Sequence, residues 1–483
     1  MSHGVERYVE LAAKAAERRS ADMAAIKKCK FDTIAVHGMY SMNEALNFNQ
    51  GSIIEPMYMA SSQAYRDSDE MEAALGYQIP TWCYSRIGNP SMYYFEQTLA
   101  LLEGYGADIE TACCATSSGM AAIASATDPF LAIDPANPTQ PINFVSTCQV
   151  YGGTFQQFAE RKMKERGIEC RWIINSNDQA EWEEKVDENT RFVYGELPSN
   201  PGQAFFDLDW VIALAHKHGA PVIIDNTVGT PALMRPLARG ADVVVQSVTK
   251  TITSSGFGIA GAVISRADIT SKFGTPEMKA NFAMYLKTLP NRDNGQNLSP
   301  MNCILSLNDM RTLRSKVDMF SQNTMAVARF LSEHPKVDAV NYLGLEDHPL
   351  HELASRYLQL VDSGENRYGH LMSFTVAGGA PAARTMFDGL QRIWRATDLG
   401  RVKSVATIPA ISTHSQQGEE GREMASIPPN MVRLCVGGEH PDDVVADLDQ
   451  ALAAIDGKVA VNVPYEFSTG GASGANVTCQ CKE

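Results

Sequence analysis

The feature that most constrains the fold is a series of short β-branched runs in the middle third of the chain. Helical patterns separate these runs, at residues 155–166 and 208–218. The runs themselves occupy residues 142–146, 192–194, 222–225, 243–245 and 262–264. Strands that alternate with helices and are apolar on both faces are typical of a largely parallel sheet covered by helices. The sequence therefore predicts an α/β domain here.

The segments on either side of this domain have a different pattern. Residues 1–30 are predicted to form an amphipathic helical arm, whereas residues 31–100 are repeatedly interrupted by Gly and Pro. Beyond residue 300 we expect one long helix over 307–334, strands at 371–376 and 432–436, and a last helix over 441–455. The chain is thus divided into an arm and inter-subunit segment (1–102), a cofactor-binding α/β domain (103–300), a smaller α+β domain (301–462) and a flexible tail (463–483).

Composition and charge exclude several classes of function. The chain has 483 residues, of which 44% are hydrophobic, so it can bury a sizeable core. Its formal net charge of −15 repels phosphate backbones and anionic lipids, so we expect neither a nucleic-acid nor a membrane partner. The N-terminus lacks the pattern of a secretory signal, and the ten cysteines are scattered. These features predict a cytoplasmic protein with reduced thiols and no metal site.

Chemically reactive side chains follow two neighbouring strands of the predicted sheet. Asp225 ends one strand, and Ser247, Thr249 and Lys250 follow the next. The carboxyl ends of parallel strands lie at one edge of a sheet, where open α/β folds bind their ligands. The sequence therefore predicts a carboxylate, two hydroxyls and an amine in one crevice.

A turn of small residues supplies a further element of this site. Ser118 and Gly119 precede a helical pattern, and the free N–H groups of a helix N-terminus bind phosphate. A phosphate site, a lysine and a carboxylate together suggest pyridoxal phosphate. The lysine forms a Schiff base with the aldehyde, and the carboxylate keeps the pyridine nitrogen protonated. Each signal taken singly also fits an ordinary strand end, turn or helix cap.

The succession of motifs resembles the Cys/Met-metabolism family of pyridoxal-phosphate enzymes, also called the trans-sulfuration or cystathionine γ-synthase-like family. The resemblance covers roughly residues 31–460. It implies a fold-type I transferase with a large, mostly parallel sheet domain and a smaller C-terminal α+β domain. In chain order the matching motifs span residues 84–90, 118–120, 151–154, 196–201, 222–231, 247–250 and 433–439.

The resemblance implies roles for individual residues. Lys250, Tyr151 and Asp225 are implied to be catalytic: Lys250 as Schiff-base lysine and proton shuttle, Asp225 as partner of the pyridine nitrogen, and Tyr151 as a ring-stacking acid or base. Tyr84 and Arg86 are implied to reach the cofactor of a neighbouring subunit, which predicts a homo-oligomer, expected to be a homotetramer of two dimers. The full set implied to bind the cofactor is Tyr84, Arg86, Ser118, Gly119, Met120, Tyr151, Asn200, Asp225, Ser247, Thr249 and Lys250.

Two residues near the C-terminus are implied to bind a small amino-acid substrate. Arg433 is expected to make a bidentate contact with its α-carboxylate. Asp398 stands where the family usually has Ser or Asn, and two facing carboxylates repel each other. Asp398 therefore orients Arg433, contacts a cationic part of the substrate, or caps a helix toward solvent. Two further departures are Thr251 in place of the usual Tyr and Gln246 in place of the usual His.

The core motifs serve γ-replacement and γ-elimination equally, so the choice depends on flanking segments. Residues 42–56 resemble O-acetylhomoserine sulfhydrylase-like members, and Gly153 lacks the thiol found there in methionine γ-lyases. We therefore expect γ-replacement on an activated homoserine ester. A γ-lyase with an unusual leaving group is the alternative, and a non-catalytic cofactor-binding relative is the alternative of another class.

Overall fold

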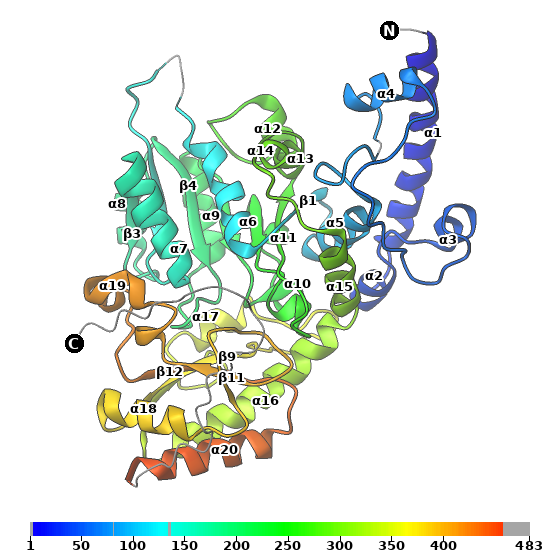
Figure 1. The fold of residues 1–483 in the computed structure, drawn as a ribbon. Coiled ribbons are helices and arrows are strands. Elements are labelled where there is room, and N and C mark those ends of the chain that lie inside the picture. The colour runs from blue at the N-terminus through cyan, green and yellow to red at the C-terminus, as the bar shows by residue number, and fades with distance from the viewer. Residues whose placement is uncertain (1–2, 81, 134–136, 457–483) are drawn as a thin grey trace, which may run out of the picture.

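Two β-sheets organise the computed structural model, which describes residues 3–80, 82–133 and 137–456 (Figure 1). The tail predicted at 463–483 lies outside these residues. The first sheet has the order β1-β7-β6-β5-β4-β2-β3, and all neighbours are parallel except β7, which runs antiparallel to β1 and β6. Its strands are β1 (Thr111–Thr116), β2 (Asn143–Thr147), β3 (Glu169–Ile173), β4 (Thr190–Glu196), β5 (Val222–Asp225), β6 (Val243–Gln246) and β7 (Gly261–Arg266).

The second sheet lies below the first in Figure 1 and has the order β10-β11-β12-β9-β8. It is antiparallel apart from the β10–β11 pair. Its strands are β8 (Val337–Asn341), β9 (Leu371–Val376), β10 (Trp394–Arg395), β11 (Val405–Thr407) and β12 (Met431–Cys435). This arrangement confirms the predicted fold class, while the exact domain limits stay a prediction.

The helices fall into three groups along the chain. The first comprises α1 (His3–Ile26), α2 (Phe31–His37), α3 (Met42–Phe48), α4 (Ser68–Leu75) and α5 (Pro90–Glu103). The first sheet carries α6 (Gly119–Thr127), α7 (Gly152–Gln156), α8 (Gln179–Lys185), α9 (Leu208–Lys217), α10 (Thr230–Leu233), α11 (Pro236–Arg239), α12 (Pro276–Ala280), α13 (Phe282–Thr288) and α14 (Pro290–Asn294). The last group is α15 (Pro300–Met310), α16 (Leu313–Glu333), α17 (His351–Ser355), α18 (Gly379–Gly389), α19 (Gly418–Met424) and α20 (Pro441–Ala453).

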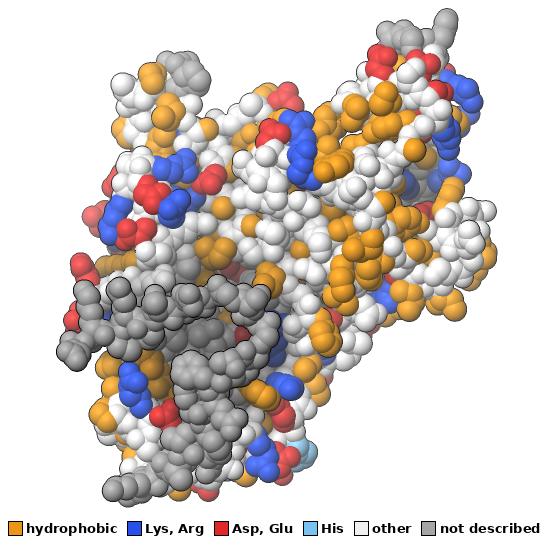
Figure 2. Space-filling model, in the orientation of Figure 1, with side chains coloured by type: hydrophobic (Ala, Val, Ile, Leu, Met, Phe, Trp, Pro, Cys, Tyr) orange, Lys and Arg blue, Asp and Glu red, His pale blue; other side chains and the backbone are white. Residues whose placement is uncertain are grey.

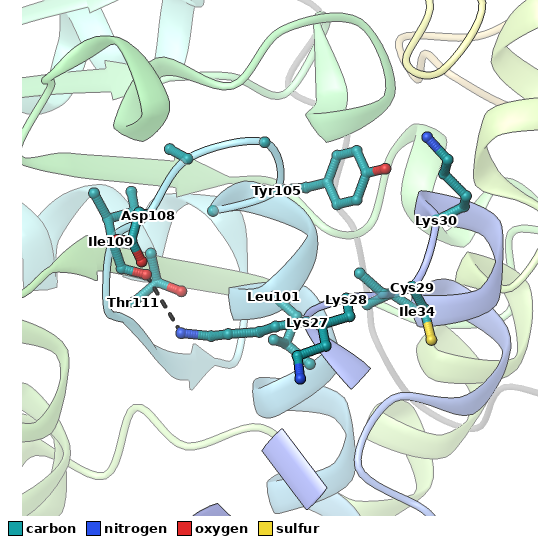
Figure 3. A pocket seen from close by; sticks show the side chains of 13 residues that line it. Lys27, Lys28, Cys29, Lys30, Ile34, Leu101, Tyr105, Asp108, Ile109 and Thr111 are labelled. Carbon is teal, nitrogen blue, oxygen red and sulfur yellow. Dashed lines mark hydrogen bonds between the residues drawn. The ribbon is translucent and has the colours of Figure 1, made fainter. Parts of the chain in front are cut away.

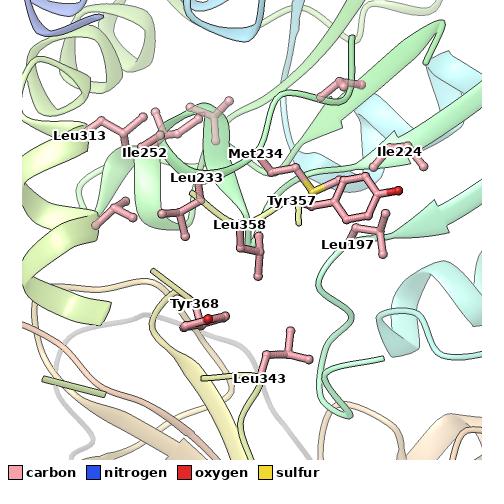
Figure 4. Packing of buried hydrophobic residues seen from close by; sticks show 14 of the residues in the cluster. Leu197, Ile224, Leu233, Met234, Ile252, Leu313, Leu343, Tyr357, Leu358 and Tyr368 are labelled. Atoms are coloured by element: carbon pink, nitrogen blue, oxygen red, sulfur yellow. The ribbon is translucent and has the colours of Figure 1, made fainter. Parts of the chain in front are cut away.

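The central strands are buried along their whole length. Every residue of β4, β5 and β6 is buried, as expected for parallel strands covered on both faces. A single hydrophobic cluster continues from this sheet to the second one, through residues such as Ile224, Leu233, Leu343 and Leu358 (Figure 4). Burial of each such leucine or isoleucine contributes about 1.5–3 kcal/mol. The shared core therefore fixes the second sheet relative to the strand ends of the first.

The predicted arm forms a helix, α1, whose N-terminus lies far from the two sheets (Figure 1). Val5 and Tyr8 pack against Ala73 and Ala74 of α4, and the Tyr8 hydroxyl donates to Asp67 at 2.7 Å. Figure 2 shows hydrophobic side chains gathered on the face near these N-terminal helices. Large apolar side chains exposed in this part of the chain include Met42, Leu46, Phe48, Ile53, Ile54, Met57 and Met59.

The prediction of one continuous helix over 307–334 is wrong. The structure has two helices, α15 and α16, separated at Arg311 and Thr312. The apolar periodicity stays in phase across this break, so the sequence pattern does not reveal it. Among the described residues, no helix has the length and hydrophobicity needed to cross a membrane.

Candidate active site

A pocket of about 250 Å³ lies at the carboxyl ends of β4, β5 and β6, beside the start of α6. It lies at the sheet edge where open α/β folds bind ligands. Nine of the residues implied to bind the cofactor line it: Ser118, Gly119, Met120, Tyr151, Asn200, Asp225, Ser247, Thr249 and Lys250. Its other lining residues are Ile123, Glu196, Thr227, Val228, Ile259, Thr397 and Leu399. The structure thus gathers residues from Ser118 to Leu399, which are 281 positions apart in the sequence.

One end of the pocket has the features of a phosphate site. Ser118 caps α6 by accepting the N–H of Ala121 at 3.1 Å, and the first amides of an α-helix have no intrahelical partner. A Cβ added to Gly119 would lie 2.6 Å from the Cβ of Ser247, so only glycine lets these two segments approach this closely. The result is a concave cradle of N–H groups and a hydroxyl, which suits an anion.

The hydroxyl of Thr249, which also lines the pocket, is hydrogen-bonded to the backbone of Ala260. This hydroxyl donates to the carbonyl of Ala260 at 3.0 Å and accepts the Ala260 N–H at 2.9 Å. These bonds fix the turn that carries Lys250, whose own N–H donates to the carbonyl of Ser247.

A pair of buried carboxylates forms the floor of the pocket. Asp225 accepts the N–H of Thr227 at 3.0 Å and the hydroxyl of Tyr194 at 3.3 Å. Burial raises the pKa of Asp225, and the bonds from Thr227 oppose that rise. A buried carboxylate of this kind is stabilised by a cation, such as a protonated ring nitrogen. The donor set and the cradle therefore fit pyridoxal phosphate.

Glu196 is a feature of this floor to which sequence reasoning gave no role. It lies opposite Asp225 in the register of β4 and β5. Its two carboxylate oxygens accept the N–H of Tyr151 at 2.7 Å and that of Asn200 at 3.0 Å. Burial and the adjacent charge of Asp225 raise the pKa of Glu196 well above its usual value. Its place at a strand end, as the first residue of the motif at 196–201, was the available signal.

Lys250 extends from the first sheet toward the loop between β10 and β11. Its amine donates to Oδ1 of Asp398 at 2.6 Å. The other oxygen of Asp398 accepts from Nε of Arg401. Burial raises the pKa of the Asp398 carboxyl, but Lys250 and Arg401 outweigh it, so the pKa is lowered overall. The side chain of Asp398 therefore points to Lys250, and its implied contact with substrate stays a prediction.

Arg433 lies beside the pocket and is fully buried on β12. Its guanidinium donates to Oδ1 of Asn200 at 3.2 Å and to the carbonyls of Thr397 and Asp398 at 3.0 and 2.6 Å. Asn200 and Thr397 both line the pocket, so Arg433 is one residue removed from it. Asp398 therefore contacts Arg433 through its backbone carbonyl.

Tyr84 and Arg86 are absent from the lining of this pocket. Tyr84 is 44% exposed, and the guanidinium of Arg86 lies 5.5 Å from the centre of its ring. Arg86 also donates to the carbonyl of Arg292. Their implied role in a neighbouring subunit's site stays a prediction.

A larger pocket, of about 390 Å³, lies between the end of α1 and the loop after α5 (Figure 3). It is lined by Lys27, Lys28 and Lys30, and the Lys27 amine donates to the carbonyl of Ile109 at 3.5 Å. Lysines near a helix C-terminus stabilise its dipole, which accounts for their position. None of the predicted site residues lines it. Across residues 3–80, 82–133 and 137–456, no group of His, Cys, Asp and Glu could hold a metal ion.

Comparison with known families gives a match over most of the chain. The model of the family described as "Cys/Met metabolism PLP-dependent enzyme" matches residues 32–453. Similar curated proteins include homocysteine synthase of Schizosaccharomyces pombe, which is 32% identical over 87% of this chain and 98% of its own. L-Methionine gamma-lyase of Porphyromonas gingivalis is 31% identical over 88% and 97%, and O-acetyl-L-homoserine sulfhydrylase of Corynebacterium glutamicum is 30% identical over the same shares.

Solved structures give the same result. A Campylobacter jejuni protein designated O-acetylhomoserine (thiol)-lyase superposes with a TM-score of 0.77 at 32% identity, covering 88% of this chain and 100% of its own. That structure contains N′-pyridoxyl-lysine-5′-monophosphate. Cystathionine gamma synthase of Xanthomonas oryzae superposes with a TM-score of 0.75 at 28% identity, covering 89% and 99%.

Proposed function

Because this chain belongs to the Cys/Met metabolism family of pyridoxal-phosphate-dependent enzymes, we propose that it catalyses γ-replacement on an activated homoserine ester. It is a pyridoxal-phosphate-dependent transferase or lyase of trans-sulfuration that acts on small amino acids. The observation that carries the choice of residues is the pocket in which Lys250, Asp225 and the Gly119–Ser247 cradle meet.

Each residue has a role that follows from its position. Gly119, Met120 and Ser247 bind the phosphate at the start of α6, and Lys250 provides the amine that attaches the cofactor. Asp225 holds the proton on the ring nitrogen from the buried floor. When bound, the cofactor withdraws electrons from Cα and so makes its proton removable. Lys250 then moves protons at Cα, Cβ and Cγ, and Tyr151 covers the ring and serves the leaving group.

The choice of replacement over elimination is supported by Gly153, which stands where methionine γ-lyases have a thiol. A Cβ added to Gly153 would lie 2.6 Å from Cε1 of the Tyr151 ring and 3.2 Å from Sδ of Met120. A cysteine at this position would therefore displace the ring. The methionine gamma-lyases among the similar proteins keep elimination as the second candidate.

The test is mass spectrometry of the products formed from O-acetyl-L-homoserine by the holoenzyme, with and without sulfide. We expect homocysteine and acetate only when sulfide is present. The appearance of 2-oxobutanoate, ammonia and acetate in both samples would establish a γ-lyase instead. Absence of turnover in both would contradict the ester substrate. Lys250→Ala is the control, and it should abolish product formation.

The active form of the chain is a homo-oligomer, expected to be a dimer of dimers. Two features support this: Tyr84 and Arg86 lie outside the pocket of their own chain, and large apolar side chains are exposed between Met42 and Met59. Apolar surface of this extent commonly marks a protein interface. Light scattering of the purified protein measures the subunit number.

A cytoplasmic location is supported by the eight free cysteines among the described residues.

A further inference from the structure

Asp398 is the acidic side chain that contacts the amine of Lys250. The two groups are 2.6 Å apart, although 148 positions separate them in the sequence and they lie on loops of different sheets. The side chain of Lys250 is 25% exposed to solvent and that of Asp398 is 30% exposed. The contact is thus a partly desolvated, charge-assisted hydrogen bond, which is stronger than a bond between neutral groups.

Arg401 fixes the carboxylate in this position. Its Nε donates to Oδ2 of Asp398, and its Nη1 donates to the carbonyls of Thr249 and Thr253, at 2.9 Å each. The Oδ1 atom that meets Lys250 also accepts the N–H of Leu399 at 2.9 Å. Asp398 therefore keeps two donors when Lys250 is elsewhere, and its position does not depend on the lysine.

The backbone of the loop is fitted to the same segment. Gly400 has a φ of +71°, and a Cβ there would lie 2.5 Å from Oγ1 and 2.6 Å from the N of Thr251. Only glycine combines this conformation with this approach. The loop of residues 398–401 is thus built directly against residues 249–253, which carry Lys250.

We propose that Asp398, held by Arg401, is a positioning residue that receives the amine of Lys250 whenever the lysine is released from the cofactor. This inference rests on the proposed function. Release occurs when the substrate's amino group replaces Lys250 on the aldehyde carbon of the cofactor. One C=N bond to the lysine is exchanged for one to the substrate, with one proton on the C=N nitrogen before and after, and the two other protons of the substrate ammonium pass to the lysine nitrogen. The lysine leaves as an ammonium, which Asp398 accepts beside the pocket.

The holding contact favours the substrate-bound form of the enzyme over the lysine-bound form. Asp398→Asn keeps the size of the side chain but removes its charge, so the released lysine loses a charge-assisted bond. Binding of an amino acid to the cofactor should weaken roughly tenfold, the ratio that corresponds to about 1.4 kcal/mol. The retained bonds of Arg401 to Thr249 and Thr253 should preserve the fold of the loop.

The experiment is a titration of the holoenzyme with an α-methyl amino acid, which has no Cα proton to lose. The readout is the visible absorbance of the bound cofactor, so no turnover is needed. The dissociation constant should rise roughly tenfold in Asp398→Asn, while cofactor content stays at the wild-type level. Asp398→Ser, which also lacks the charge, should raise the dissociation constant as well. It replaces Asp398→Asn in the test if that variant does not fold.

Asp318→Asn is the matched control. Asp318 pairs with Arg367 at 2.6 Å and is 31% exposed, so it resembles Asp398 in distance and burial but lies outside the pocket. It should leave the dissociation constant unchanged. An unchanged constant in Asp398→Asn would overturn the proposal, as would tighter binding, which would mean that Asp398 acts by repelling the substrate carboxylate. If the wild-type absorbance fails to respond to any amino acid, the proposed function itself is overturned.

Discussion

At the scale of single residues, Glu103, the last residue of α5, is a buried acid that lies outside the pocket. It is fully buried and accepts from the side-chain amides of Gln246 at 2.6 Å and Asn226 at 3.3 Å. Burial raises its pKa to about 7, which the two amides and the nearby Arg235 oppose. Gln246 and Asn226 are the chain neighbours of Ser247 and Asp225, so Glu103 supports two pocket residues from behind.

The pH dependence of stability follows from this raised pKa. The folded protein favours the neutral acid, so the contribution of Glu103 is fully present below its usual pKa of 4.5 and is lost as pH rises through about 7. At about 1.4 kcal/mol per pKa unit, the loss is on the order of 3 kcal/mol. The difference in free energy of unfolding between wild type and Glu103→Gln should therefore shift in favour of the variant between pH 5 and pH 8. Denaturant midpoints at both pH values measure this difference. The exposed Glu17→Gln is the control, and a pH-independent gap for Glu103→Gln would contradict the prediction.

Residue identities in the pocket were largely predictable, whereas their partners were not. Asp225 and Lys250 follow strands whose apolar runs are visible in the sequence. The contact between Lys250 and Asp398 joins two separate sheets, and no local pattern encodes it. The same is true of Glu196, whose two acceptor contacts involve backbone N–H groups that the sequence does not distinguish.

At the scale of elements, the phosphate cradle depends on the approach of α6 to the turn after β6. Gly119→Ala places a methyl group 2.6 Å from Cβ of Ser247, so the helix start and the turn must separate. Overpacking of this kind costs about 1–3 kcal/mol, and every 1.4 kcal/mol is tenfold in affinity. We expect the dissociation constant for pyridoxal phosphate to rise by about tenfold or more, as measured by equilibrium titration of the apoprotein.

Gly202→Ala is the control for this prediction. A Cβ there has only the carbonyl of Ala425 nearby, at 3.9 Å, so the added methyl meets no obstacle. Equal cofactor affinity in the two alanine variants would show that the cradle is not the phosphate site.

Elements with strong patterns were predicted and weak ones were missed. The strands β5, β6 and β9 coincide with β-branched or apolar runs, as does α9 with its helical pattern. By contrast, β1 consists mainly of small residues, and its strand partner is β7, which is distant in sequence. The two-residue strand β10 is too short to show a period.

At the scale of the whole molecule, the proposed sharing of sites between subunits can be tested by complementation. Lys250→Ala and Arg86→Ala are co-expressed in equal amounts, and the whole pool of oligomers is assayed without separating mixed from unmixed pairs. If Arg86 serves a neighbour's pocket, one of the two sites in each mixed pair is intact, and random pairing restores about a quarter of the wild-type sites. If Arg86 serves its own pocket, every site carries a defect and activity stays at the level of the parent variants. Wild type co-expressed with Lys250→Ala gives the reference value.

The two carbonyl bonds of Arg401 have a consequence for movement between the sheets. The Arg401 guanidinium donates to backbone carbonyls on both sides of Lys250 and to the Asp398 carboxylate, which contacts the lysine amine. A small displacement of the C-terminal sheet therefore moves two groups together: the backbone around Lys250 and the Asp398 carboxylate that contacts the lysine amine. The distance between the lysine amine and the carboxylate therefore changes little when the C-terminal sheet moves slightly.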